Sequence, residues 1–256
     1  MEKMTKIAVL MTCYNRVDTT LECLRRLFAQ KLPTGHSLDV WLVDDASPDQ
    51  TGERVKAVFP QVNVIQGTGL LFWCKGMRLA WDKAAEAYDY DFYLWLNDDV
   101  KLKPMALFGM IADYLRTKGV IVGKFSSDES EREISYAFGK HYMNGNFVLI
   151  SKEIYRKVGK ICGRYHHQYG DFDYGTLVKK AGEALISSSD FCGVCKQELS
   201  KYHGLANKGL FERIKLLWDP LGYDIHDAVL YRYRQNGLFR AICTALHVVY
   251  VVLKGK

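Results

Sequence analysis

Two adjacent aspartates follow an aromatic and aliphatic segment in the first half of the chain. Residues 92–96 read Phe-Tyr-Leu-Trp-Leu, which predicts a buried strand, and Asn97, Asp98 and Asp99 come directly after it. Neighbouring carboxylates repel each other, and a hard divalent cation with oxygen ligands would keep both ionised. The alternative is that Asp98 or Asp99 caps the helix expected to begin near Pro104. These residues alone leave both alternatives open.

A second acidic turn lies later in the chain. Asp171 and Asp173 precede an expected helix that ends near Gly182, so they are the second candidate for chemistry. The simpler alternative is that one of them caps this helix and interacts favourably with its dipole.

A cysteine pair raises the question of a zinc site. Cys192 and Cys195 have the spacing of half such a site or of a redox pair, but the sequence contains no second pair of this kind. His203, or His166 with His167, would complete four ligands only if the fold happened to bring them together. We therefore do not expect zinc here.

The elements that position these residues alternate between strand and helix up to residue 123. Apolar runs predict strands at 6–11, 39–43, 62–65, 92–96 and 119–123, and apolar residues at three- and four-residue spacing predict helices at 17–28, 52–59, 73–88 and 104–117. This order predicts an α/β fold with a mostly parallel, Rossmann-like sheet flanked by helices. In such sheets ligands bind outside the carboxyl ends of the strands. We therefore expect four loops to meet at one crevice: 12–16, 44–49, 67–75 and 97–99.

The pattern changes after residue 123 to an α+β arrangement. A polar, charged loop at 126–133 is followed by expected strands at 134–138 and 146–150. A helix is expected at 151–158, with Ser151 as its N-cap.

Composition places the chain among globular proteins. It has 256 residues, of which 48% are hydrophobic, enough for one large domain or one domain with an appendage. Seven scattered cysteines do not suggest a disulfide framework, and we see no secretory signal. We therefore expect a cytoplasmic protein.

The basic charge is concentrated at the C-terminus. Net charge is +6, and residues 201–256 contain nine Lys or Arg against four Asp or Glu. In the apolar segment 238–253, the polar residues Arg240, Thr244 and His247 share one helical face. The segment is short for a bilayer span, and its pattern fits attachment to a membrane surface. Docking on the protein's own core or on a second subunit is the alternative.

Residues 6–182 resemble the family 2 glycosyltransferases, which have the GT-A fold and transfer a sugar from a nucleotide-diphosphate donor. Residues 9–16 are similar to that family's first strand and nucleotide loop, and residues 43–49 to its second acidic loop. Asn97-Asp98-Asp99 stands where the family carries its DXD-type metal-binding motif. The order and spacing of these segments carry the resemblance.

The resemblance implies roles for the donor side of the site. Thr12, Tyr14 and Asp45 would hold the base and ribose, with Arg16 nearby, and Asp98 would contact the donor's ribose or the metal.

The resemblance also implies a metal cofactor. Asp99 would bind Mg²⁺ or Mn²⁺, which neutralises the diphosphate as it leaves. Lys75 could reach a phosphate, although a lone lysine at a helix start is often only solvated. Some relatives place an additional metal ligand where this chain has His203.

Asp171 falls where the family places its catalytic base, usually the second acid of a Glu-Asp pair. Gly170 replaces the Glu here, which leaves Asp171 and Asp173 as alternatives, and we prefer Asp171 because it aligns with the second acid. As general base it would take the proton from an acceptor hydroxyl, with inversion at the anomeric carbon.

The expected protein is thus an inverting, metal-dependent glycosyltransferase that moves one sugar from a UDP- or dTDP-sugar to a glycan or lipid-linked glycan. It would act in the cytoplasm, at the inner membrane face where surface polysaccharide is made, with peripheral membrane contact and no nucleic-acid partner. The Gln-x-x-Arg-Trp motif of processive synthases is absent, which favours single transfers. We expect a catalytic domain over 1–200, with a nucleotide-binding half (1–123) and an acceptor half (124–200), and a helical tail over 201–256.

Two alternatives belong to other classes. A sugar-phosphate nucleotidyltransferase would need a glycine-rich, basic loop after the first strand, and residues 12–16 contain no glycine. A catalytically silent nucleotide- or glycan-binding module would keep the fold but bind nucleotide without regard to Mn²⁺.

Overall fold

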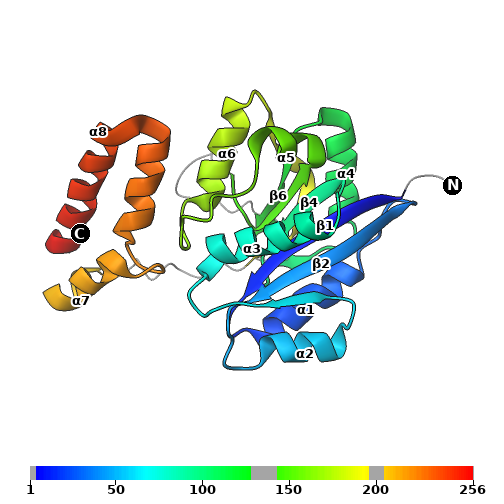
Figure 1. Ribbon diagram of the computed structural model, residues 1–256, viewed down its shortest axis with the longest axis horizontal. Helices are drawn as coiled ribbons and strands as arrows, with labels where there is room; N and C mark the ends of the chain where they lie inside the picture. The colour runs from blue at the N-terminus through cyan, green and yellow to red at the C-terminus, as the bar shows by residue number, and fades with distance from the viewer. Residues whose placement is uncertain (1–3, 128–142, 196–204, 256) are drawn as a thin grey trace.

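The computed structural model of the chain describes residues 4–127, 143–195 and 205–255 (Figure 1). Within these residues, one sheet has eight strands in the order β3-β2-β1-β4-β7-β6-β8-β5. The strands are β1 (Thr5–Cys13), β2 (His36–Asp44), β3 (Asn63–Gln66), β4 (Phe92–Leu96), β5 (Lys101–Leu102), β6 (Val120–Ser126), β7 (Phe147–Ser151) and β8 (Leu185–Val194).

Helices connect and cover these strands. They are α1 (Val17–Phe28), α2 (Thr51–Val58), α3 (Phe72–Ala87), α4 (Ala106–Thr117), α5 (Lys152–Val158), α6 (Gly170–Lys180), α7 (Leu210–Lys215) and α8 (Ile225–Lys254). Ser151 caps α5 as expected, because its side chain accepts a hydrogen bond from the amide of Ile154.

The N-terminal half is the parallel sheet that the sequence predicts. β1 pairs in parallel with both β2 and β4, and β2 pairs in parallel with β3. The carboxyl ends of these strands therefore meet at one edge. β7 then enters antiparallel between β4 and β6, which gives a mixed sheet overall. The short β5 and the polar β8 were not expected, and the strand expected at 134–138 lies outside the described residues.

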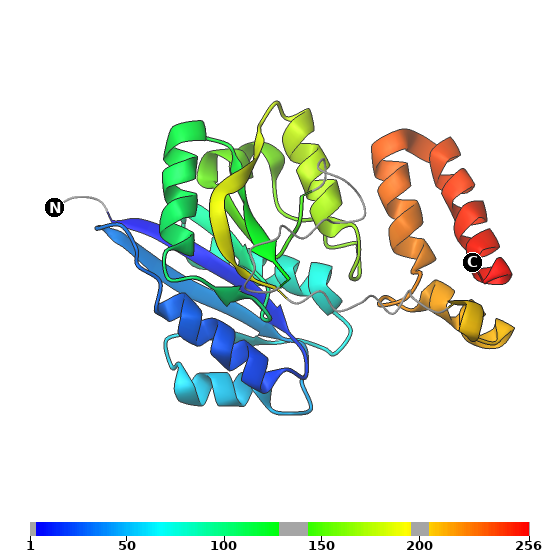
Figure 2. The ribbon, with the colours of Figure 1, turned by 180° about the vertical axis from the view of Figure 1, so that it is seen from behind.

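Side chains alternate between two hydrophobic cores, one on each face of the sheet. In β1, Ile7 and Val9 contribute to a core with residues of α1, α2 and α4. Ala8 and Leu10 contribute to the opposite core with α3, α5 and α6. Figure 1 shows α3 and α5 in front of the sheet, and Figure 2, from behind, shows α1 and α4. This three-layer packing fixes the strand ends that carry the polar loops.

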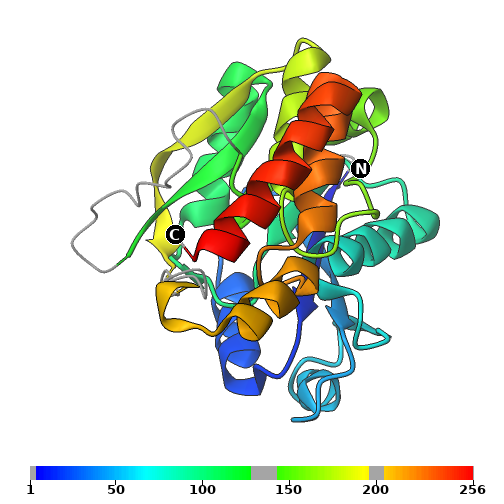
Figure 3. The same cartoon turned by 90° about the vertical axis from the view of Figure 1, so that its left-hand side faces the viewer.

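The C-terminal helices stand beside this body. Backbone dihedrals at Gly237 (φ 81°, ψ −179°) are not helical, so α8 consists of a first arm (225–236) and a second arm (238–254) that runs back along it (Figure 3). Glycine adopts such a conformation without the steric penalty that a side chain would bring. The first arm lies between the main body and the second arm.

The helix-cap alternative for Asp98 and Asp99 is wrong. The N-cap of α4 is Met105, without a side-chain hydrogen bond, and β5 separates the two aspartates from that helix. Their carboxylates are therefore available for another purpose.

Candidate active site

Asp98 and Asp99 lie at the carboxyl edge of the sheet, beside the loop that follows β1. The Nη1 atom of Arg16 donates a hydrogen bond to Oδ2 of Asp99 at 3.0 Å and lies 3.6 Å from Oδ1 of Asp98. The hydroxyl of Thr20 donates to Oδ2 of Asp98 at 3.2 Å. The structure therefore brings Arg16, Asp98 and Asp99 together, although they are far apart in sequence.

The two carboxylates differ in their surroundings. Burial and the neighbouring charge of Asp99 raise the pKa of Asp98 to about 7, despite the opposing effect of Arg16. Asp99 is more exposed, but its Oδ1 atom is buried and has no hydrogen-bond partner within the described residues. An unpaired carboxylate oxygen beside a second carboxylate fits a divalent cation, because such ions prefer oxygen ligands.

A chain of hydrogen bonds connects this edge to the first turn of α6. The indole of Trp73 donates to Oδ1 of Asn97 at 2.7 Å, and the Asn97 amide donates to Oδ1 of Asn146 at 2.7 Å. One residue before Asn146, the backbone amide of Gly145 donates to Oδ2 of Asp171 at 3.0 Å. The turn 144–146 thus lies between the candidate metal ligands and the candidate base.

Gly145 makes this close arrangement fit. A Cβ atom at this position would lie 2.6 Å from the ring of Trp73 and 3.3 Å from Cβ of Asp171. Only a residue without a side chain lets Trp73 and Asp171 approach the same turn from their two sides.

Asp171 has the environment of a group that titrates near neutral pH. Burial raises its pKa to about 6, although the amides of Gly145 and Phe172 partly oppose this by donating hydrogen bonds to the carboxylate. In the described part of the chain, Asp171 forms no salt bridge with a lysine or arginine. Asp171 is therefore a carboxylate that can both lose and accept a proton near neutral pH.

Asp173 is used differently. Its carboxylate is fully buried and contacts Arg234 of α8 with both oxygens, at 3.2 and 3.1 Å from Nε and 3.0 Å from Nη2. The side chain of Gln235 donates to it as well. Asp173 therefore fastens the first arm of α8 to α6.

Asp45 organises the loop after β3. Its buried carboxylate accepts hydrogen bonds from the backbone amides of Gly69, Leu71 and Phe72, at 2.7 to 3.0 Å. This fixes the chain between β3 and α3 against the end of β2, next to the edge that carries the aspartates.

The remaining expected donor-side residues occupy the same edge. Thr12 is partly buried near the end of β1, and Tyr14 in the next loop is 55% exposed. Lys75 lies in the first turn of α3, partly buried, and has no hydrogen bond or ion pair within the described residues. His203 lies outside the described residues.

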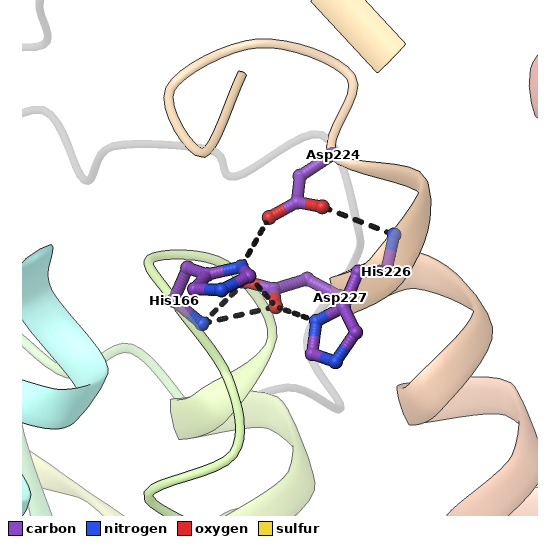
Figure 4. A group of neighbouring side chains, drawn as sticks. All are labelled: His166, Asp224, His226 and Asp227. Carbon is purple, nitrogen blue, oxygen red and sulfur yellow. Dashed lines mark hydrogen bonds and ion pairs between the residues drawn. The ribbon is translucent and has the colours of Figure 1, made fainter. Parts of the chain in front are cut away.

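The sequence did not predict a second polar cluster that the structure contains. His166, Asp224, His226 and Asp227 come together where the loop before α6 meets the start of α8 (Figure 4). Asp227 accepts from three consecutive amides, at 166–168, and Nδ1 of His166 lies 2.8 Å from Oδ2 of Asp224. The cluster thus holds α8 to this loop. No spacing pattern signals it, because its two halves lie almost sixty residues apart.

The cysteine pair is not part of a metal site among the described residues. Cys192 and Cys195 are both buried; Cys192 lies near Ser188, and Cys195 accepts from the side chain of Asn146. Neither belongs to a group of three or more metal-ligating residues in that part of the chain.

The sequence of residues 8–169 matches the model of the family described as glycosyl transferase family 2. The chain belongs to this family. That match includes β1, β2 and β4 with the loops that follow them, which carry Arg16, Asp45, Asp98 and Asp99, and it ends before Asp171. A comparison with curated proteins found no match.

Solved structures support the fold of this family 2 chain. A mannosyltransferase from Pyrobaculum calidifontis, solved in complex with GDP-Man and Mn²⁺, superposes with a TM-score of 0.59 and 16% identity, over 100% of this chain and 77% of that one. S. aureus TarS 1–349, in complex with UDP-GlcNAc, gives 0.62 and 14%, over 98% and 81%. At these identities the likeness shows a shared GT-A fold.

Proposed function

We propose that this family 2 protein is an inverting glycosyltransferase that moves one sugar from a nucleotide-diphosphate donor to a hydroxyl of a glycan or lipid-linked glycan. The observation that carries the proposal is the pair of carboxylates on either side of the turn 144–146. Asp99 has a buried oxygen without a partner, and Asp171 has a pKa near neutrality. Glycosyl transfer needs both a cation for the leaving diphosphate and a base for the attacking hydroxyl.

On the donor side, Asp99 and Asp98 would hold Mg²⁺ or Mn²⁺, with His203 as a further ligand. When bound, this ion supplies positive charge that stabilises the departing diphosphate. Arg16 already lies against both aspartates, and Lys75 is a cation without a protein partner in the described residues, so both would bind phosphate oxygens.

The nucleotide would lie against the loop after β1. Thr12 and the exposed ring of Tyr14 would contact the base and ribose. Asp45 serves the same site by fixing the 67–72 loop, since its carboxylate accepts three of that loop's amides. The complexes of the similar structures, with GDP-Man and Mn²⁺ and with UDP-GlcNAc, support a donor of this class. A UDP- or dTDP-sugar is our proposal here.

On the acceptor side, Asp171 acts as the general base. It removes the proton from the acceptor hydroxyl while that oxygen bonds to the anomeric carbon and the bond to the diphosphate breaks. Attack opposite the leaving group inverts the configuration. The amide of Gly145 and the helix N-terminus hold the carboxylate in place, and Asp173 does not compete because Arg234 occupies it.

We further infer that the enzyme acts at the cytoplasmic face of a membrane, where lipid-linked acceptors for surface polysaccharide are found. The basic C-terminal segment and its exposed apolar residues support peripheral contact with that membrane.

Donor hydrolysis tests the function without knowledge of the acceptor, because water can replace the acceptor hydroxyl. Purified protein is incubated with UDP-, dTDP- and GDP-sugars in the presence of Mn²⁺ or of a chelator, and nucleotide diphosphate release is measured. We expect release that needs the metal and is lost in Asp99→Asn. Asp113→Asn, which changes a buried aspartate on α4, is the matched control. Nucleotide binding that does not depend on metal, without any release of nucleotide diphosphate, would contradict the proposal and favour a catalytically silent binding module.

A further inference from the structure

The second arm of α8 has an apolar side that faces away from the protein. Its large apolar residues are exposed and recur every three or four positions, so they share one side of the helix. We call this side the outer face: Leu238 (65% exposed), Phe239 (75%), Ile242 (51%), Leu246 (67%), Tyr250 (58%) and Leu253 (48%). A continuous apolar stripe of this kind on a soluble protein marks a surface that something else covers.

The opposite side of the same arm faces the protein, and its buried residues are Ala241 and Val252. Thr244, His247 and Val248 of this side line a pocket. Its other walls include Tyr231 of the first arm, and Tyr169 and Phe172, which lie on either side of Asp171 in the sequence. An ordinary surface helix turns its apolar side to the core and its polar side to water. This arm is apolar on both sides, because Ala241 and Val252 are buried against the protein while the large residues of the outer face stay exposed. The outer face is therefore not the side that fills the protein's own core.

The helix next to this arm adds exposed aromatic surface. Phe211 in α7 is 83% exposed, and Trp218, shortly after it, is 68% exposed. Arg213 ties α7 to the end of the second arm by donating a hydrogen bond to the carbonyl of Leu253 at 3.1 Å. Amphipathic aromatic rings such as Trp are favoured at the boundary between water and lipid.

The charges around the outer face are basic. Among the exposed charged residues of 205–255, Glu212 is the one acid, against five cations: Lys208, Lys215, Arg232, Arg240 and Lys254. Asp224 and Asp227 are buried in the cluster with the two histidines and do not offset this charge at the surface. An apolar face surrounded by Lys and Arg is complementary to a bilayer with anionic headgroups.

The shape of α8 favours lying on a membrane over crossing it. Among the described helices, α8 alone is long and apolar enough to span a bilayer, but its length is divided by the turn at Gly237. The second arm, 238–254, is shorter than the about 20 residues that a span requires. It also runs back along the first arm, so both of its ends stay on the same side as the protein (Figure 3).

We propose that the outer face of α8 binds an anionic lipid surface and that the acceptor reaches Asp171 from that surface. The same helix would then contact lipid with one side and border, with the other, the pocket lined by Tyr169 and Phe172. This places the candidate base at the edge of the bilayer, where a sugar carried on a lipid would be presented. The part about the acceptor rests on the proposed glycosyltransferase function; the lipid binding does not.

Vesicle co-sedimentation tests the lipid binding directly. The full chain is mixed with phosphatidylcholine vesicles that either contain or lack phosphatidylglycerol. We expect binding to the anionic vesicles and at least about tenfold weaker binding for the double variant Phe239→Ser/Leu246→Ser, since each lost apolar side chain removes buried area. Leu115→Ser is the matched control, because Leu115 is 60% exposed but lies on α4, and it should bind as the wild type does.

The charge is tested in the same assay. Arg240→Gln/Lys254→Gln should lower the affinity for anionic vesicles by roughly fivefold per charge and leave the weak binding to neutral vesicles unchanged. Melting temperatures of all variants are compared, and they should agree because the substituted side chains are exposed.

Three results would overturn the inference: no binding of the wild type to anionic vesicles, equal binding of the wild type and the apolar double variant, or a dimer in light scattering that the double variant abolishes. The last would assign the outer face to a second copy of the chain. Donor hydrolysis in solution distinguishes the two proposals, because the double variant should keep it. Lipid binding without any hydrolysis would overturn the proposed transfer reaction, and the acceptor route with it, but not the lipid binding. Hydrolysis without lipid binding would overturn this inference and the proposed membrane location, but not the transfer reaction.

Discussion

Asp171 and Asp173 lie two residues apart in the first turn of α6, yet their carboxylates have different partners. Arg234 binds both oxygens of Asp173, whereas Asp171 accepts hydrogen bonds from the backbone amides of Gly145 and Phe172. Burial without a neighbouring cation makes the carboxylate of Asp171 a stronger proton acceptor. This difference gives Asp173 an anchoring role and supports Asp171 as the proposed base.

Replacement of aspartate by asparagine should therefore lower the stability of the protein at position 173 but not at position 171. Asp173→Asn removes a buried ion pair and is expected to lower the free energy of unfolding by about 2 to 4 kcal/mol, with little change in turnover per folded molecule. Asp171→Asn should keep the stability of the wild type, because the lost acceptor oxygen is offset by removal of a desolvated charge. Urea unfolding of both variants decides this; equal destabilisation would contradict the assigned difference.

The pH dependence of turnover follows from Asp171. Its pKa is raised to about 6, and a general base must be ionised to act, so activity is lost as pH falls through about 6 and is constant above it. The measurement is kcat for donor hydrolysis at saturating donor and Mn²⁺. Donor affinity is determined at each pH as a control, since Asp98 also titrates. A rate that stays level from about pH 7 to about pH 5 would exclude Asp171 as the base.

Metal binding should depend on the protonation of Asp98. Because its pKa is raised to about 7, metal-free protein loses stability as pH rises from about 4 to about 7, and below pH 7 an ion must displace a proton. We expect Mn²⁺ to raise the melting temperature more at about pH 8 than at about pH 6. In Asp98→Asn this difference should shrink. An equal rise in melting temperature at both pH values would indicate that Mn²⁺ does not bind at Asp98.

Gly145→Ala should damage catalysis more than stability. The new methyl group would lie 2.6 Å from the ring of Trp73, and Trp73 must move or the turn must shift away from Asp171. Displacement of a catalytic group by about 1 Å lowers turnover by roughly a hundredfold. Kinetics of Gly145→Ala are compared with those of Gly109→Ala, a position on α4 where a Cβ meets nothing within 4 Å.

The sequence was most informative where structure is local. The strands and helices up to residue 123 and the acidic loops at their ends follow from periodicity, because each signal lies within one short segment. β8 was not predicted because four of its ten residues are polar, the run Ser-Ser-Ser-Asp in the middle of Leu185–Val194. β5 was not predicted because it has only two residues. Among the described residues, β5 pairs only with Gly193 and Val194, so the polar residues of β8 lie on an open stretch of the sheet edge, where a strand need not be apolar.

The site itself was only partly predictable. The aspartates could be named because acidic pairs after strands are unusual, but Asp171 and Asp173 could not be separated, since the partner of Asp173 lies 61 residues away. The hydrogen bonds that join Trp73, Asn97 and Asn146 also connect residues far apart in the sequence, so they could not be predicted from it either. For the second arm of α8, the polar stripe was visible in the sequence, but which side faces the protein depends on the turn at Gly237.

The most direct test of the proposed function is the rate of Mn²⁺-dependent donor hydrolysis by Asp171→Asn. We expect a rate about a hundredfold to ten-thousandfold below that of the wild type, because this is the contribution of a general base. Donor affinity in calorimetry should be unchanged, and the rate of Asp173→Asn should be close to that of the wild type. An Asp171→Asn protein that binds donor and hydrolyses it as fast as the wild type would contradict the proposed function.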